Sequence, residues 1–183
     1  MKTNKIILGI DPGTIITGYG IINISGKTPI LENFGHIDLS KLTDPYEKLK
    51  MIFEKTVYLI KTYKPDEFAI EAPFFGKNVQ SMLKLGRAQG VSIAAAVSNN
   101  LPVFEYSPRK IKMAITGSGA ASKEQVAVFL KNLLKFDKIP AKLDATDGLA
   151  VAVCHFYQNK STIGKGTTSS WKSFINQNPG RIK

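Results

Sequence analysis

The chain has 183 residues, 43% of them hydrophobic, a size that suits one compact domain rather than two. Its apolar runs are shorter than the ~18 residues that a membrane-spanning helix needs, and the apolar stretch after the basic start meets Asp11 too soon for a signal peptide. A single cysteine excludes an intramolecular disulfide framework. The sequence therefore predicts a cytoplasmic protein without a membrane partner.

The net charge of +11 is unevenly distributed along the chain. Residues 1–75 are balanced, whereas residues 76–142 carry eleven basic and three acidic side chains, and residues 159–183 carry five basic side chains and no acidic one. A basic middle and end favour a surface that faces a polyanion, most simply a nucleic acid. The alternative is a charge that serves solubility alone.

The first part of the chain predicts three strands, a helix and a fourth strand. Short β-branched segments at 6–10, 18–24 and 30–37 are separated by turn-forming residues, which is typical of an antiparallel meander. Asp44, followed by proline, is typical of a helix start, and apolar residues recur after it at helical spacing. The strand at 68–71 follows this helix, so we expect it to run parallel to the first strand.

The second part of the chain alternates helices with one more strand. Asn78 is a candidate cap for a helix to about Asn99, and residues 103–106 form a strand candidate. Three further helices are predicted, from Pro108, from the capping box at 122–125 to Leu134, and from Asp144 to about Phe156. The pattern predicts one α/β domain over residues 1–157. The Lys-, Ser- and Gly-rich residues 158–183 are expected to form a basic, disordered tail.

Four acids stand at the ends of predicted elements. Asp11 ends the first strand before a Pro-Gly-Thr turn, Glu71 ends the fourth strand, and Asp144 and Asp147 share one face of a helical first turn. Each has an ordinary explanation, as a turn former, a surface acid, a helix cap or a first-turn acid. If the first and fourth strands are adjacent, however, the four carboxylates converge on one point.

Carboxylates that converge repel one another unless cations lie between them. Hard oxygen ligands select Mg²⁺, with Mn²⁺ as a substitute. A pair of such ions activates a water and stabilises the leaving oxygen of a phosphodiester. The four acids and the basic middle together predict a metal-dependent nuclease.

Several motifs occur in a fixed order between Ile6 and His155. They are Gly-Ile-Asp-Pro-Gly-Thr at 9–14 with Thr-Gly-Tyr-Gly at 17–20, Ala-Ile-Glu at 69–71 with Phe-Phe-Gly-Lys-Asn at 74–78, Leu-Lys-Leu-Gly-Arg-Ala-Gln-Gly at 83–90, and Asp-Ala-Thr-Asp-Gly-Leu-Ala at 144–150. An isolated Asp-x-Gly-Thr is weak, because sugar kinases and actin-like ATPases also carry it. Together the motifs resemble the RuvC family of bacterial Holliday junction resolvases. The resemblance implies an RNase H-like α/β fold, with a five-stranded mixed sheet flanked by helices.

The resemblance also implies an activity. The family acts as a homodimer that nicks two opposing strands of a four-way DNA junction symmetrically, leaving ligatable 5′-phosphate and 3′-hydroxyl ends in recombination and repair. In the family, the acids that match Asp11, Glu71, Asp144 and Asp147 bind Mg²⁺ and are required for cleavage. We expect Asp11 to bridge two ions, Glu71 to hold one, and the other two acids to hold the second ion or orient the attacking water.

The family also implies partners and further site residues. Lys112 and Lys123 match lysines near the scissile phosphate, and Phe74 matches an aromatic that stacks on bases at the junction centre. The alternative for Phe74 and its neighbour is a core pair. The remaining candidate DNA contacts are Phe75, Lys77, Lys84, Arg87, Arg109 and Lys110, some of which are expected to be solvated helix faces. The expected protein partners are a second copy of the chain, through the helix at 78–99, and the RuvA–RuvB branch-migration complex.

Three other functions compete with this interpretation. An actin-like kinase or ATPase needs a second such domain, for which the chain is too short. A YqgF-like RNA-processing nuclease shares the fold but lacks the Glu-x-x-Phe-Phe and Leu-Gly-x-x-x-Gly arrangements, and a non-catalytic junction-binding protein does not need four acids. Adjacent Cys154 and His155 suggest a soft-metal site, but helical neighbours point in different directions, which favours core packing.

Overall fold

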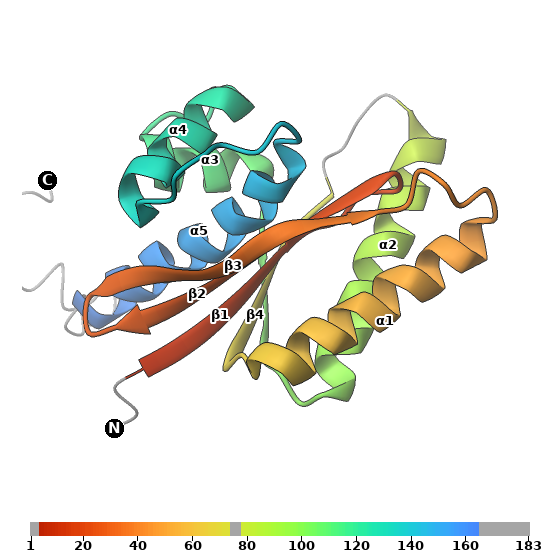
Figure 1. Ribbon diagram of the computed structural model, residues 1–183, viewed down its shortest axis with the longest axis horizontal. Helices are drawn as coiled ribbons and strands as arrows, with labels where there is room; N and C mark the ends of the chain where they lie inside the picture. Colours follow the sequence, from red (N-terminus) through yellow and green to blue (C-terminus); the bar gives the residue numbers. More distant parts are fainter. Residues whose placement is uncertain (1–3, 74–77, 165–183) are drawn as a thin grey trace, which may run out of the picture.

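The computed structural model describes residues 4–73 and 78–164, with side chains up to Asn159. Five strands and five helices lie in these segments (Figure 1). In chain order they are β1 (Asn4–Asp11), β2 (Ile16–Ser25), β3 (Thr28–Asp38), α1 (Pro45–Tyr63), β4 (Glu67–Glu71), α2 (Val79–Ser98), β5 (Val103–Tyr106), α3 (Pro108–Thr116), α4 (Lys123–Leu134) and α5 (Asp144–Gly164).

The strands form one mixed sheet in the order β3-β2-β1-β4-β5. The first three strands pair antiparallel, whereas β4 pairs parallel to both β1 and β5. The predicted meander and the predicted parallel pairing of the first and fourth strands are therefore confirmed. The five-stranded mixed sheet flanked by helices, expected from the resemblance, is confirmed as well.

Helices cover both faces of the sheet. Helices α1 and α2 pack together on one face, and α3, α4 and α5 lie on the other (Figure 1). One buried apolar cluster lies beneath α5, and two smaller ones lie on the α1–α2 face. The chain segment before α1 and the segment before α5 both return to the end of the sheet where β1 ends, which is where the site is built.

Helix α5 lies directly against the backbone of β2. A Cβ atom at Gly20 would lie 2.3 Å from the Cα of Leu149, and one at Gly18 would lie 1.9 Å from the carbonyl oxygen of Asp144. Only glycine permits this approach, because any side chain would displace backbone. The two glycines thus place the first turn of α5 beside the carboxyl end of β1.

The predicted helix starts are confirmed. The Asp44 carboxylate accepts hydrogen bonds from the backbone N–H groups of Tyr46 and Glu47, the Asn78 side chain accepts from Ser81 N–H, and Ser122 forms a capping box.

The predicted end of the last helix is wrong. Helix α5 continues from Asp144 to Gly164 rather than ending near Phe156, because no glycine or proline lies between Phe156 and Gly164. Residue 157, the predicted end of the domain, therefore falls inside α5. Among the described helices, none is both long and apolar enough to cross a membrane.

Candidate active site

Three of the four predicted acids line one cavity at the carboxyl end of the central strands. In the parallel register of β1 and β4, Ile10 is opposite Ile70, so Asp11 and Glu71 are the next residues on two adjacent strands. Asp147 joins them from the first turn of α5, and the cavity that they line has a volume of about 190 Å³. The predicted convergence is confirmed for these three acids.

Asp144 lies one turn before Asp147 on α5, and both carboxylates contact the same lysine. The Lys123 ammonium, at the start of α4, forms an ion pair with Asp147 and lies 3.6 Å from an oxygen of Asp144. Burial lowers the pKa of Lys123, but the hydrogen bond and charge of Asp147, with the charges of Asp11 and Asp144, raise it overall. Lys123 therefore stays protonated and is the nearest counter-charge to the acids.

The acids themselves are held in an environment that disfavours their charge. Burial raises the pKa of Asp11 well above its ordinary value, and the negative charges of Glu71, Asp147 and Asp144 raise it further. Burial and the charge of Asp147 raise the pKa of Glu71 to about 7. Burial is also the largest cause that raises the pKa of Asp147. The charges of Lys123 and Lys112 lower the pKa of Glu71 and Asp147 but do not offset these causes, so a further cation would stabilise the ionised site.

The donor set fits a hard divalent cation. All four groups are carboxylates, which are the ligands that Mg²⁺-type ions prefer. Among the described residues, no three acidic, His or Cys side chains already stand in the geometry of a metal site. The Lys123 ammonium instead contacts Asp147 and Asp144.

The order of the motifs and this arrangement of acids agree with a known family. A family model described as "Crossover junction endodeoxyribonuclease RuvC" matches residues 7–155, a range that contains all four acids. The chain belongs to the RuvC family.

Curated RuvC relatives match the chain over nearly its full length. The "Crossover junction endodeoxyribonuclease RuvC" of Christiangramia forsetii is 59% identical over 100% of this chain and 95% of the relative. The protein of the same name from Bacteroides fragilis is 58% identical over 98% of this chain and 96% of the relative. The similarity therefore extends over nearly all of each relative.

Solved RuvC structures share the fold. The structure described as T. thermophilus RuvC in complex with Holliday junction substrate has a TM-score of 0.80 and 27% identity, covering 86% of this chain and 96% of that one. A second Thermus thermophilus RuvC structure gives a TM-score of 0.76 with 29% identity, over 86% and 97% of the two chains. The similarity to RuvC structures thus extends over most of the described elements.

The basic residues that the RuvC resemblance singled out lie in three places. Lys112 and Lys123 line the acidic cavity. Lys84 and Arg87 line a second cavity on the α1–α2 face of the sheet. Arg109 and Lys110 line a shallow hollow on α3, where the Lys110 ammonium lies 5.1 Å from the centre of the Tyr106 ring. The candidates Phe74, Phe75 and Lys77 lie outside the described residues.

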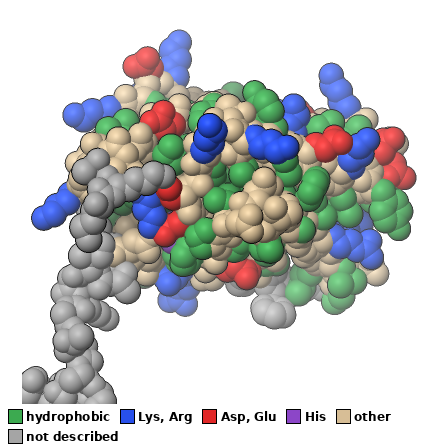
Figure 2. Space-filling model, turned by 90° about the horizontal axis from the view of Figure 1, so that it is seen from below, with side chains coloured by type: hydrophobic (Ala, Val, Ile, Leu, Met, Phe, Trp, Pro, Cys, Tyr) green, Lys and Arg blue, Asp and Glu red, His purple; other side chains and the backbone are tan. Residues whose placement is uncertain are grey.

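Figure 2 shows how the charge is distributed on one face of the molecule. Lys and Arg side chains project all around this face, with acidic and hydrophobic side chains between them, rather than forming a single patch. The basic residues Lys84, Arg87, Arg109, Lys110, Lys112 and Lys123 likewise line three separate cavities.

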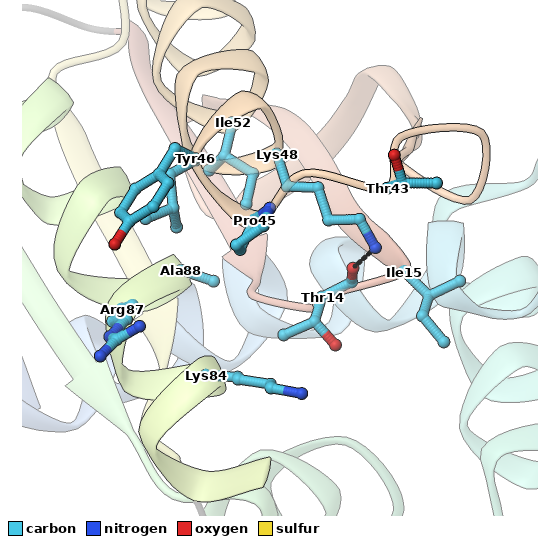
Figure 3. A pocket seen from close by; sticks show the side chains of 11 residues that line it. Thr14, Ile15, Thr43, Pro45, Tyr46, Lys48, Ile52, Lys84, Arg87 and Ala88 are labelled. Atoms are coloured by element: carbon cyan, nitrogen blue, oxygen red, sulfur yellow. Dashed lines mark hydrogen bonds between the residues drawn. The ribbon is translucent and has the colours of Figure 1, made fainter. Parts of the chain in front are cut away.

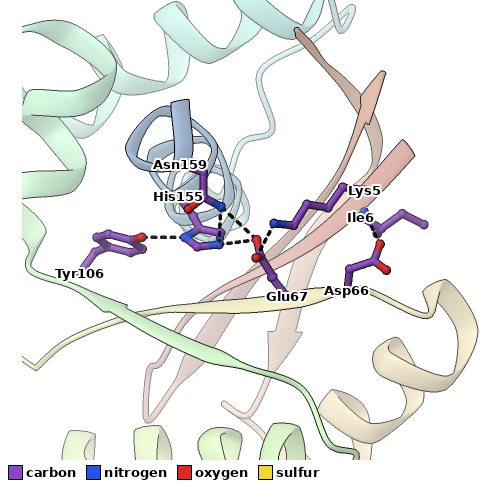
Figure 4. A network of polar contacts seen from close by, with 7 residues as sticks. All are labelled: Lys5, Ile6, Asp66, Glu67, Tyr106, His155 and Asn159. Carbon is purple, nitrogen blue, oxygen red and sulfur yellow. Dashed lines mark hydrogen bonds and ion pairs between the residues drawn. The ribbon is translucent and has the colours of Figure 1, made fainter. Parts of the chain in front are cut away.

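Cys154 and His155 do not form a metal site together. Both are fully buried. The His155 ring bonds to Tyr106 and Glu67 (Figure 4), whereas the Cys154 sulfur lies near the carbonyl oxygen of Lys110. The prediction of core packing is confirmed. The polar network around His155 was not predicted, because its members are far apart in the sequence.

Proposed function

We propose that this protein resolves four-way DNA junctions by metal-dependent hydrolysis of phosphodiester bonds, with symmetric nicks that leave 5′-phosphate and 3′-hydroxyl ends. One observation carries the proposal: in a chain of the RuvC family, Asp11, Glu71 and Asp147 line one cavity together with two lysines. Relatives named crossover junction endodeoxyribonucleases and a RuvC structure with a Holliday junction substrate support the substrate class.

Asp11, Glu71, Asp144 and Asp147 would hold the metal, which we propose to be Mg²⁺, two per site, with Mn²⁺ as a substitute. When bound, such ions supply an activated water and stabilise charge on the leaving oxygen. The chain contributes four buried or half-buried carboxylates, pre-arranged by β1, β4 and α5, whose mutual repulsion the ions relieve.

Lys112 and Lys123 are the cations nearest to the acids. Both line the acidic cavity, and Lys123 is already paired with Asp147. We assign them to the scissile phosphate, where each would balance the negative charge that develops during hydrolysis. The other DNA contacts of this proposal are Phe74, which would stack on an unpaired base, and the remaining candidates Phe75, Lys77, Lys84, Arg87, Arg109 and Lys110.

Two symmetric cuts require two active sites, so the proposed form is a homodimer. Helix α2 offers the surface for it. Within the described part of the chain, a Cβ atom at Gly86 or Gly90 would meet no atom within 4 Å, and Leu83 and Val97 are more than half exposed on the same helix. Small residues let two helix backbones approach closely, and the apolar side chains beside them would be buried on association. The RuvA–RuvB complex is the further partner that family membership suggests.

The test is a labelled four-way junction incubated with the protein and Mg²⁺, beside duplex, single-stranded DNA and single-stranded RNA. We expect paired nicks in the junction alone, and ends that ligase can seal. Equal cutting of duplex and junction contradicts the proposal, cutting of RNA favours a YqgF-like nuclease, and binding without cutting favours a non-catalytic junction-binding protein.

A pair of matched variants tests the site. Asp11→Asn should abolish cleavage but keep junction binding, whereas Asp137→Asn, which removes an exposed acid outside the cavity, should cut as the wild type does. Cleavage by Asp11→Asn would show that the acids are not the metal ligands.

A further inference from the structure

A second cavity, of about 390 Å³, lies between the turn after β1, the start of α1 and the first half of α2 (Figure 3). It is about twice as large as the acidic cavity and lies on the other face of the sheet. Its polar lining comes from Thr14, Thr43, Tyr46, Lys48, Lys84 and Arg87. The volume is within the range of sites that hold a nucleotide-sized group.

The described charged residues that line this cavity are all basic. Lys48, Lys84 and Arg87 line it, and of the residues that the structure describes, no Asp or Glu does so. The nearby Asp44 carboxylate accepts the N–H groups of Tyr46 and Glu47 as the cap of α1, so its charge is directed to the helix start. Three cations around one concave surface attract an anion, because the hollow focuses their field.

Lys48, which lines this cavity, also contacts the turn that follows Asp11. Its ammonium donates a hydrogen bond of 3.2 Å to the carbonyl oxygen of Thr14, which uses one of its three N–H donors. Lys84 and Arg87 are three residues apart on one face of α2. Figure 3 shows Lys84 extending beneath Thr14, and Arg87 on the same side of the cavity as Tyr46.

One lining residue of each cavity belongs to the same short segment of the chain. Thr14 follows Asp11 by three residues, so their Cα atoms are at most ~11 Å apart. Successive phosphates of a strand advance by ~3.4 Å along a duplex axis. Thr14, which lines the second cavity, is therefore within the span of a few nucleotides of a phosphate held at Asp11.

We propose that this cavity binds a backbone phosphate of the junction, a few nucleotides from the scissile bond, through Lys48, Lys84 and Arg87. The inference rests on the proposed function, because it takes junction DNA as the ligand. Its role is to fix the register of the strand in the active site: a phosphate held against the Asp11–Thr14 turn sets how far the strand extends into the acidic cavity.

The first experiment measures the salt dependence of junction binding without divalent metal. The variant is Lys84→Gln with Arg87→Gln, and the matched control is Lys55→Gln with Lys61→Gln, which removes the same charge from exposed positions of α1 outside the cavity. In the cavity variant we expect binding about 10–100-fold weaker at 0.1 M salt, with a log–log salt slope smaller by about 1–2. The control should lose less than about threefold. Equal losses and equal slopes in the two variants overturn the proposal.

The second experiment locates the phosphate. Junctions that carry one neutral methylphosphonate are scanned across positions near the cleavage site. Wild-type protein should lose affinity at one or two positions a few nucleotides from the cut, and the cavity variant should be insensitive at those same positions. Equal sensitivity of wild type and variant at every position excludes a phosphate in this cavity. If the double variant has a lower unfolding temperature, Lys84→Gln alone repeats the scan.

The two proposals fail in different ways. A wild-type protein that neither prefers nor cuts junctions contradicts the proposed function. A wild-type protein that cuts junctions, together with a cavity variant whose salt slope and methylphosphonate profile are unchanged, contradicts the phosphate site alone.

Discussion

Strand β4 carries two glutamates with opposite surroundings at its two ends. Glu67, at the amino end, forms an ion pair with Lys5 and accepts hydrogen bonds from His155 Nε2 at 2.8 Å and Asn159 Nδ2 at 3.0 Å (Figure 4). Glu71, at the carboxyl end, lines a cavity with two other acids, and its pKa is raised to about 7 by burial and by the charge of Asp147. The carboxylate at one end of the strand thus has hydrogen-bond donors around it, whereas the carboxylate at the other end is buried beside further negative charges.

Glu67 therefore contributes to folding stability, whereas Glu71 belongs to the proposed active site. The donors around Glu67 stabilise its charge, so that end of β4 ties β1, β4 and α5 together. The acids around Glu71 cost folding free energy, which is typical of a site built for a ligand that arrives later. Variants at the two positions should therefore have opposite effects.

The largest effect is expected on cleavage. Glu71→Gln should lower the rate of junction cleavage by about a thousandfold or more, because it removes a proposed metal ligand. Glu67→Gln should stay within about threefold of wild type, because Glu67 lies at the other end of the strand. Single-turnover cleavage with saturating protein and Mg²⁺ measures both, and similar losses in the two variants would contradict the comparison.

Substitutions at Glu67 and at Glu71 should change the free energy of unfolding in opposite directions. Glu67→Ala should lower the free energy of unfolding by about 2–3 kcal/mol, because it leaves the His155 and Asn159 donors without their acceptor. Glu71→Gln should raise it in metal-free solution at pH 8, by on the order of 2 kcal/mol. Urea unfolding in the presence of a chelator measures both. A Glu71→Gln protein that is less stable than wild type would show that the acids are not in conflict.

The gain from Glu71→Gln should depend on pH. The pKa of Glu71 in the folded protein, about 7, lies above its ordinary value of 4.5, so its contribution to stability is fully present below pH 4.5 and is lost as the pH rises through 7. The difference in unfolding free energy between Glu71→Gln and wild type should therefore grow from pH 5 to pH 8 without metal. Added Mg²⁺ should reduce it at pH 8, because the ion stabilises the ionised site. A difference that is constant with pH would exclude Glu71 as its source.

The smallest effect is expected from His155. Burial lowers its pKa, so the neutral ring is favoured in the fold, with Nε2–H donating to Glu67 and Nδ1 accepting from Tyr106. Burial also raises the pKa of Tyr106 to about 12, which keeps its O–H protonated. A lowered folded pKa contributes stability above the unfolded value, near 6.5, that is lost as the pH falls. Wild type should thus lose stability between pH 6.5 and 5, relative to His155→Gln, in urea unfolding at fixed salt.

Much of the site could be predicted from local sequence. Asp11 and Glu71 were identifiable because a charged residue at the end of an apolar strand must project at the end of the sheet. Asp144 and Asp147 were identifiable because a spacing of three places them on one helical face. Their convergence then required only that β1 and β4 pair in parallel, which the helix between them made the expected arrangement.

The cations could not be placed in the same way. Lys123 is 24 residues from Asp147, yet it is the counter-charge of the acids, and Lys48 contacts Thr14 across 34 residues. Lys84 and Arg87 lie in the same basic stretch of sequence as Lys112 and Lys123 but on the opposite face of the sheet. Long side chains on amphipathic helices carry no local signal of the surface that they will face.

The sequence by itself determined the order of the elements, the caps of the helices and the four acids, because strand and helix periodicity and capping act over a few residues. Only the tertiary structure determined which basic side chain lies at which cavity, and that Glu67 and Glu71 have opposite surroundings. The reason is that burial and the charge around a side chain are set by segments distant in sequence, which meet only when α5 packs on β2 and α2 packs beside α1.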